Sequence, residues 1–166
     1  MPSPARWFAV AAFVVVLDQL VKWLFLSSFF PGERRGVTSF FNLVLVYNKG
    51  AAFSFLAEAP GWQAPLLAGF AVAAAAVVSV LIVRNRGKAL MCSGLALVLG
   101  GAIGNLVDRV RFGYVVDFLD FHAMGWHFPA FNVADSAITV GAALLIIEGF
   151  FHSENPARDG RSRPAP

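Results

Sequence analysis

An uncharged, apolar run at residues 64–83 constrains this chain more than any other stretch of its sequence. A helix of this length rises about 30 Å at ~1.5 Å per residue, which matches the hydrocarbon core of a bilayer. Hydrophobic residues make up 58% of the chain and charged residues only 14%, a composition that does not describe an ordinary soluble domain. The run therefore predicts a transmembrane helix in an integral membrane protein.

Three further apolar runs predict three more spans, at residues 7–30, 89–107 and 134–151. The first is interrupted by Asp18, Gln19 and Lys22. A cleaved signal peptide is disfavoured there because the run is long, carries central charges and lacks a small-residue cleavage site before Pro31. The prediction is an all-α membrane protein with four transmembrane helices in a single domain over residues 1–152.

A polar interlude at residues 31–60 separates the first two spans. Within it, residues 39–47 are typical of a strand, Asn48 to Gly50 of a turn, and residues 51–56 of a return strand. We expect a small extracytoplasmic β-rich element on the membrane surface, between helices 1 and 2. Asn48 is either a turn residue only or part of a functional site.

Basic residues predict the orientation of the four spans. Those at the amino end, in the 84–88 loop and in the tail all fall on one side, which the positive-inside rule assigns to the cytoplasm; Arg34, Arg35, Arg109 and Arg111 count against this. Both termini are then cytoplasmic, and the polar tail at 153–166 is expected to be disordered. Asn48, the end of the third span, Asp117 and the start of the fourth all lie at the outer surface.

Two carboxylates in apolar settings, Asp117 and Asp135, are the main indication of chemistry. A carboxyl group among branched and aromatic side chains is poorly hydrated, which raises its pKa, and a second carboxyl nearby raises one of the two further. Such a pair can share one proton, so that one acid serves as general base toward water and the other as general acid. The sequence predicts this pair without establishing that the two acids meet.

Other polar residues lie inside or at the ends of the spans. Asp18 and Lys22 are four residues apart, so on a helix they share a face and form an ion pair, which either locks the helix or serves the site. Gly100 and Gly104 form a small-residue face that allows another helix of the protein, or a substrate helix, to approach closely. Asn105, Asp108 and Arg109 end the third span as a polar cluster, costly at the bilayer edge.

The surroundings of the three candidate acids indicate which of them is the partner of Asp135. Arg109 adjoins Asp108 and favours its charged form, so Asp108 suits an ion pair better than proton sharing. Asp117 has the apolar neighbours that raise a pKa and is preferred, with Asp120 as the fallback. Two plainer interpretations stay open: Asp117 caps a turn, and Asn132 with Asp135 has the spacing of a helix N-cap plus an acid at N3.

Several other functions fit the sequence less well. Cys92 has apolar neighbours and lies near the cytoplasmic end of the third span, so a cysteine nucleophile is disfavoured. His122 and His127 with Asp117 or Asp120 fit no helical zinc motif, and no metal or cofactor is expected. A small proton-coupled transporter would also explain charges in the membrane, and a structural scaffold would leave the acids unexplained. Nucleic acid is an unlikely partner because the basic residues form no stripe.

Five stretches taken together resemble bacterial lipoprotein signal peptidase, the type II signal peptidase. They match in order from the first span to the fourth: Asp18 with Lys22, NKGAAF at 48–53, GGAIGNLVDR at 100–109, VVDF at 115–118, and FPAFNVAD at 128–135. Each motif alone is weak, and the set is specific.

The resemblance implies an aspartyl endopeptidase of the bacterial inner membrane that cuts prolipoproteins before a diacylglyceryl-modified cysteine. Its catalytic pair corresponds to Asp117 and Asp135. Matching positions imply substrate contact or site geometry for some residues and supporting roles for others. The first group is Asn48, Gly50, Asn105, Arg109 and Asn132; the second is Asp18, Lys22 and Asp108. A membrane-lipid environment, a monomer and inhibition by the cyclic peptide globomycin are further expectations.

Overall fold

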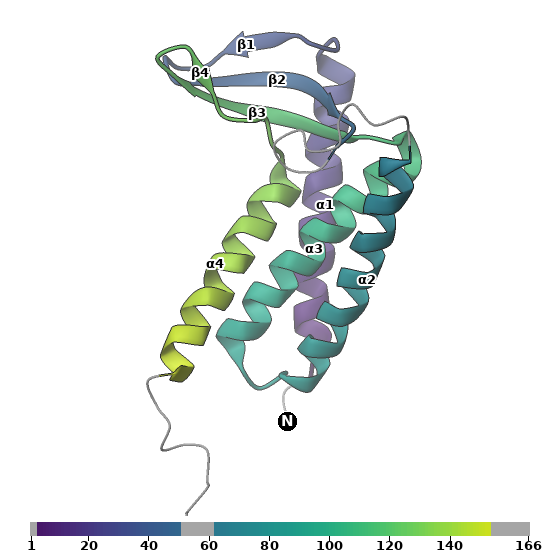
Figure 1. Ribbon diagram of the computed structural model, residues 1–166, viewed down its shortest axis with the longest axis vertical. Helices are drawn as coiled ribbons and strands as arrows, with labels where there is room; N and C mark the ends of the chain where they lie inside the picture. Colours follow the sequence, from purple (N-terminus) through teal and green to yellow (C-terminus); the bar gives the residue numbers. More distant parts are fainter. Residues whose placement is uncertain (1–2, 51–61, 154–166) are drawn as a thin grey trace, which may run out of the picture.

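Four long helices form the membrane-spanning part of the protein. The computed structural model describes residues 3–50 and 62–153. Its helices are α1 (Ala5–Ser28), α2 (Gln63–Arg84), α3 (Ala89–Phe112) and α4 (Val133–Ser153). Each contains a segment long and apolar enough to cross a membrane, which confirms the four predicted spans. The helices run side by side, and a small sheet sits across one end of them (Figure 1).

Helix α3 is the central helix, because it packs against α1, α2 and α4. Its glycines allow this. A Cβ on Gly100 would lie 2.7 Å from the Ala11 carbonyl oxygen on α1, and one on Gly94 would lie 2.8 Å from the Gly141 carbonyl oxygen on α4. Real Cβ atoms do not approach so closely, so these positions exclude larger residues. The predicted close approach of a helix at Gly100 is thereby confirmed, and that helix is α1.

The sheet has four antiparallel strands in the order β1-β2-β3-β4. Strands β1 (Arg34–Gly36) and β2 (Phe41–Asn48) come from the predicted interlude, so the β-rich element is confirmed there. The expected return strand at 51–56 lies outside the described residues. In the described sheet, β2 instead pairs with β3 (Val115–Ala123), which continues through a tight turn into β4 (Trp126–His127).

The second half of the sheet therefore comes from the connection between α3 and α4, which was not predicted as strand. Helix α3 continues past the predicted end of its span as far as Phe112, so Asp108 and Arg109 are helical. Gly113 then takes φ +78° at the helix C-cap, a conformation that favours glycine, and turns the chain into β3. Phe118 stacks on Phe25 of α1 at 4.4 Å between ring centroids, which fixes β3 against the helices.

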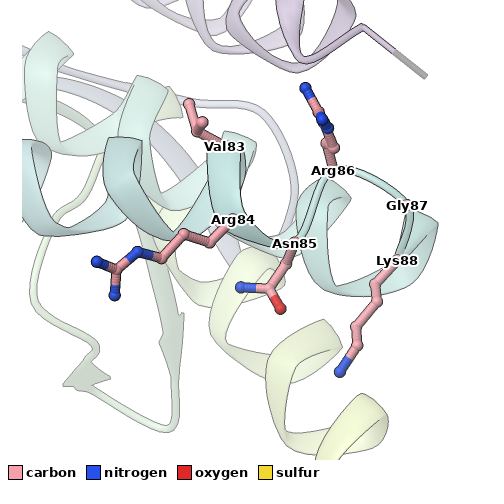
Figure 2. A pocket seen from close by; sticks show the side chains of 6 residues that line it. All are labelled: Val83, Arg84, Asn85, Arg86, Gly87 and Lys88. Carbon is pink, nitrogen blue, oxygen red and sulfur yellow. The ribbon is translucent and has the colours of Figure 1, made fainter. Parts of the chain in front are cut away.

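The opposite end of the bundle holds the short α2–α3 loop and the start of α1 (Figure 1). Residues 83–88 line a cavity of about 460 Å³ there. Its three basic side chains, Arg84, Arg86 and Lys88, point in different directions (Figure 2), so they do not converge on one ligand. Among the described residues, 83–88 line this cavity and none of them is a carboxylate that could act as general acid or base.

Candidate active site

A cavity of about 800 Å³ lies where the sheet meets the ends of α3 and α4. Asp117 and Asp135 are the two carboxylates among the described residues that line it, so the structure brings the predicted pair to one site. Asn48, Asn105 and Arg109 line it as well. The rest of the lining is mostly apolar and includes Phe128 and Phe131 after the sheet and Ile138 and Val140 on α4.

Asp117 is held by two side-chain amides. It lies on β3 with 2% of its surface exposed. Its Oδ1 accepts a hydrogen bond from Asn132 Nδ2 at 2.7 Å, and its Oδ2 accepts one from Asn48 Nδ2 at 3.1 Å. The pKa of Asp117 is raised to about 7: burial and, next, the negative charge of Asp135 raise it, and the two amide hydrogen bonds and the charge of Lys22 oppose them. Both protonation states are then accessible near neutral pH.

Asp135 is held by a helix cap. Asn132 Oδ1 accepts from the Asp135 backbone N–H at 2.9 Å, and Asp135 Oδ2 accepts from the Asn132 backbone N–H at 3.2 Å. This reciprocal pair starts α4, so the predicted N-cap is confirmed. The other carboxylate oxygen, Oδ1, accepts from Asn105 Nδ2 at 2.8 Å. Capping therefore fixes the position of Asp135 without removing it from the cavity.

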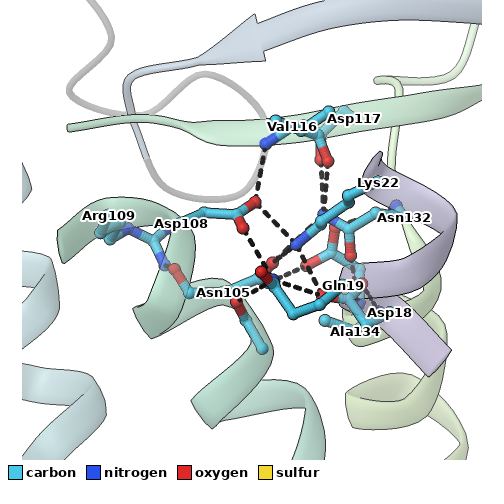
Figure 3. Close-up of polar contacts among 12 residues, drawn as sticks. Asp18, Gln19, Lys22, Asn105, Asp108, Arg109, Val116, Asp117, Asn132 and Ala134 are labelled. Carbon is cyan, nitrogen blue, oxygen red and sulfur yellow. Dashed lines mark hydrogen bonds and ion pairs between the residues drawn. The ribbon is translucent and has the colours of Figure 1, made fainter. Parts of the chain in front are cut away.

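Asn132 connects the two acids through hydrogen bonds. It is fully buried, and besides capping α4 its Nδ2 donates to Asp117 Oδ1, to the Val116 carbonyl and to Asn105 Oδ1. Figure 3 shows these amides gathered between β3 and the start of α4. Because Asn132 forms hydrogen bonds with both Asp117 and Asp135, a change at Asn132 would disturb the two acids together.

A buried ion cluster, made of Asp18, Lys22 and Asp108, lies next to these amides. Lys22 Nζ is 2.8 Å from Asp18 Oδ2 and 2.8 Å from Asp108 Oδ2. The predicted Asp18–Lys22 pair is confirmed. The predicted ion pair of Asp108 is confirmed, but its partner differs from the expected Arg109: within residues 3–50 and 62–153 the cation bridged to Asp108 is Lys22, which reaches it from α1 although 86 positions separate them in the chain.

The two acids of this cluster also bind backbone. The Ala134 N–H at the start of α4 donates to Asp18 Oδ1 at 2.9 Å, and the Val116 N–H on β3 donates to Asp108 Oδ2 at 3.0 Å. The cluster thus joins α1, α3, β3 and α4 directly behind the catalytic candidates (Figure 3).

Arg109, Asn48 and Gly50 meet at the cavity wall. Arg109 donates to the Gly50 and Asn105 carbonyl oxygens, both at 3.4 Å. Asn48 Oδ1 accepts from the Gly50 N–H at 3.0 Å, which is the hydrogen bond of an Asx turn. The two interpretations of Asn48 are therefore compatible, because its oxygen forms the turn while its amide nitrogen donates to Asp117.

Asp120, the fallback partner, has its own set of contacts away from the cavity. It accepts from Asn42 Nδ2 at 2.8 Å and from His127 Nδ1 at 2.9 Å, and Arg34 lies at 3.5 Å. Burial would raise its pKa, but the hydrogen bonds and the positive charges outweigh burial and hold the pKa of Asp120 below its usual value. It stays ionised and is engaged elsewhere.

Two contributors, Gln19 and Asn42, were not predicted from the sequence. Gln19 Nε2 donates to Asp108 at 2.8 Å and to the Gly104 carbonyl at 3.1 Å; its place between Asp18 and Lys22 was the available signal. Asn42, the donor to Asp120, gave none, because an asparagine in a strand-like run is read as an exposed residue.

The residues of the disfavoured mechanisms lie apart from the carboxylate pair. The His122 and His127 rings are 5.0 Å apart, and His127 bonds to Asp120. In the part of the chain that the structure describes, no three ligating side chains gather closely enough to hold a metal ion. Cys92 is buried near the α2–α3 loop, where its Sγ lies 3.1 Å from the Asn85 carbonyl oxygen.

Known proteins are similar to this chain over most of its length. The family described as signal peptidase (SPase) II matches residues 10–151. A lipoprotein signal peptidase of Cupriavidus necator is 56% identical over 146 residues, covering 88% of this chain and 83% of the relative; one of Paraburkholderia phytofirmans is 54% identical, covering 88% and 85%.

Solved structures agree as well. A bacterial membrane enzyme determined by the in meso method at 2.3 Å resolution superposes with a TM-score of 0.79 at 27% identity, covering 98% of this chain and 95% of the other. A second, at 1.9 Å, gives 0.75 at 30% identity, covering 87% and 92%. The fold, the length of the match and the identity lead to one conclusion: the chain belongs to the signal peptidase II family, and it is a multi-pass membrane protease.

Proposed function

We propose that this protein is an aspartyl endopeptidase that removes the signal peptide from prolipoproteins by cutting before a diacylglyceryl-modified cysteine. The relatives named lipoprotein signal peptidase support the substrate class. The observation that carries the catalytic type is a pair of carboxylates, the buried Asp117 and the half-buried Asp135, in the wall of one cavity. Membership of the signal peptidase II family also leaves no observation that favours the transporter alternative.

The chemistry follows from the two carboxyl groups. One ionised carboxylate takes a proton from a water molecule, and that water attacks the scissile carbonyl carbon. The other, protonated carboxyl donates a hydrogen bond to the oxyanion and then gives its proton to the leaving amine. With the pKa of Asp117 at about 7, the pair holds one proton near neutral pH. The two groups titrate as a coupled pair, so the shared proton belongs to both.

The cavity walls suit a substrate that is partly lipid and partly peptide. Ile138 and Val140 line the cavity from within a membrane span, so acyl chains and the apolar end of a signal peptide can stay in the bilayer. Arg109, Asn48 and Gly50 supply polar groups at the level of the sheet, where the peptide around the cut would lie. We assign substrate contact to these three residues, site geometry to Asn105 and Asn132, and supporting roles to Asp18, Lys22 and Asp108.

The same proposal covers location. The 84–88 loop and the start of α1 lie at one end of the bundle, and β3 and the start of α4 lie at the other (Figure 1). These two elements carry Asp117 and Asp135. Basic loops favour the cytoplasm, so the active site faces the extracytoplasmic side of a bacterial inner membrane. The enzyme acts as a monomer, and a globomycin-type cyclic peptide inhibits it.

The test is cleavage of a purified diacylglyceryl-modified prolipoprotein in detergent by the wild type, Asp117→Asn and Asp135→Asn. Asparagine keeps the shape and removes the acid, so both variants should lose about 1,000-fold or more in rate. Asp120→Asn is the matched control, because it lies on the same strand, is equally buried and does not line the cavity. Circular dichroism and gel filtration verify that each variant is folded.

Retention of cleavage by folded Asp117→Asn would refute the pair. Loss of cleavage in folded Asp120→Asn, with Asp117→Asn active, would move the catalytic role to Asp120. A wild type that never cuts but carries a solute across proteoliposomes along a proton gradient would revive the transporter.

A further inference from the structure

Lys22 is a buried cation with three partners. Its side chain is 2% exposed, and its Nζ lies 2.8 Å from Asp18, 2.8 Å from Asp108 and 3.0 Å from Asn105 Oδ1. A lysine ammonium has three N–H donors, and these three acceptors use all of them. Two partners are carboxylates, which alone would satisfy an ion pair. The third is a neutral amide that belongs to the site.

The contact with Asn105 decides which way its amide points. Asn105 Oδ1 accepts from Lys22 and, at 3.2 Å, from Asn132 Nδ2, while its own Nδ2 donates to Asp135 Oδ1 at 2.8 Å. Rotating the amide by half a turn would set its N–H₂ group against two other donors. It would also set its oxygen against the Asp135 carboxylate. The Lys22 ammonium on one side of the Asn105 amide therefore keeps the donor, Asn105 Nδ2, directed at Asp135 on the other side.

We propose that Lys22 is a positioning residue for cleavage: its ammonium orients the Asn105 amide so that Asn105 Nδ2 holds Asp135 in the geometry that the reaction needs. This rests on the proposed function, because it takes Asp135 as a catalytic acid. The route is short and continuous, from α1 through one amide on α3 to the first turn of α4 (Figure 3). Lys22 touches neither the cavity nor the reacting atoms.

Substitution of Lys22 alone would not distinguish a positioning role from a purely structural one. The ion cluster also anchors the Ala134 and Val116 backbone, so removing Lys22 alone leaves two buried carboxylates unpaired and endangers the fold. A neutral replacement of the whole cluster avoids this: Asp18→Asn, Lys22→Met and Asp108→Asn together keep the volume and the acceptors for both backbone N–H groups. The variant loses the three charges, the Lys22 N–H donors and a carboxylate oxygen that accepts from Gln19 at each aspartate, and with the Lys22 donors it loses the fixed direction of the Asn105 amide.

The experiment measures kcat and KM for prolipoprotein cleavage by this triple variant, with and without Asn105→Ala. Misplacement of a catalytic group by about 1 Å costs about 100-fold, so kcat of the folded triple variant should fall by about that factor while KM changes by less than about threefold. In the Asn105→Ala background the triple substitution should change kcat by less than about threefold, because the relay is already broken. Lys88→Met, at the other end of α3, is the matched control and should keep the wild-type kcat.

Three results would overturn the proposal. They are a folded triple variant with kcat within threefold of wild type, an equal loss in the Asn105→Ala background, and a triple variant that does not fold, which would assign the cluster to folding. Failure of the proposed function is recognised separately, by retained cleavage in Asp117→Asn and Asp135→Asn.

Discussion

Strand β3 carries two aspartates that are buried alike and behave in opposite ways. Asp117 is 2% exposed and Asp120 is 3% exposed, and only three positions separate them. The pKa of Asp117 is raised to about 7, while that of Asp120 is lowered. One lies in the cavity wall beside a second carboxylate. The other is enclosed by Asn42, His127 and Arg34.

The comparison shows that partners, and not burial, decide what a buried acid can do. Desolvation is the largest influence on both pKa values. At Asp117, neutral amides and a neighbouring negative charge do not offset the desolvation, so the pKa stays raised. At Asp120, cations and a close amide outweigh the desolvation and lower the pKa. The first arrangement keeps a proton available near neutral pH. The second fixes a charge that ties the four strands together.

The largest expected effect is an opposite dependence of stability on pH. A carboxyl whose pKa is raised in the folded state loses stability as pH rises from about 4 to about 7, because only the unfolded chain ionises it freely. Asp117→Asn should therefore become increasingly more stable than wild type over this range. A pKa raised from 3.8 to about 7 corresponds to at most about 4 kcal/mol. Unfolding in detergent, followed at several pH values, measures it.

Asp120→Asn should show the reverse. The lowered pKa contributes stability above about pH 4 that is lost as pH falls through the folded value, so the variant should be less stable than wild type at pH 5 to 8 and approach it in acid. Parallel curves for the two variants would contradict the comparison.

A matched pair of asparagines sharpens the same contrast. Asn132 donates to Asp117 at 2.7 Å, and Asn42 donates to Asp120 at 2.8 Å. We expect Asn132→Ala to lower kcat about 100-fold, since it releases both carboxylates of the proposed pair, and to cost about 1 kcal/mol for the lost cap. Asn42→Ala should cost about 1.5–3 kcal/mol of stability, because a hydrogen bond to a charged group is lost, with kcat within about threefold of wild type. Equal losses of kcat would show that the two faces of β3 are not distinct in function.

The smallest expected effect is at Asn48. Its amide donates to Asp117 at 3.1 Å and lowers the pKa of that acid, so Asn48→Ala should raise it further. The alkaline limb of the pH–rate profile, which reports loss of the shared proton, should then move to higher pH by up to about one pH unit. A limb that moves to lower pH would show that Asn48 does not act on the acid in this way.

Much of this arrangement is predictable from local spacing. Runs of apolar residues locate the four spans, the four-residue interval predicts the Asp18–Lys22 pair, and the three-residue interval predicts the Asn132–Asp135 cap. These patterns succeed because helices and caps depend on neighbours within one turn. The apolar setting of Asp117 likewise indicates a raised pKa before any contact is known.

Contacts between distant segments account for the rest. The sheet joins β2 to β3, which lie about seventy residues apart, and the apolar residues around Asp117 do not alternate in the way that predicts a strand. Chain proximity favoured Arg109 as the partner of Asp108, but packing of α1 against α3 brings Lys22 there instead. The role of Asn42 depends wholly on the strand register, which places it opposite Asp120.

Titration of Asp117 itself shows whether the two carboxyl groups share a proton. It is followed by carboxyl ¹³C NMR of aspartate-labelled protein, and the signal is assigned by its absence in Asp117→Asn. The coupled pair predicts a midpoint near pH 7 in the wild type that moves to lower pH in Asp135→Asn, where the neighbouring charge is gone. A midpoint below about pH 5, or one that Asp135→Asn leaves unchanged, would show that the two carboxyl groups do not share a proton.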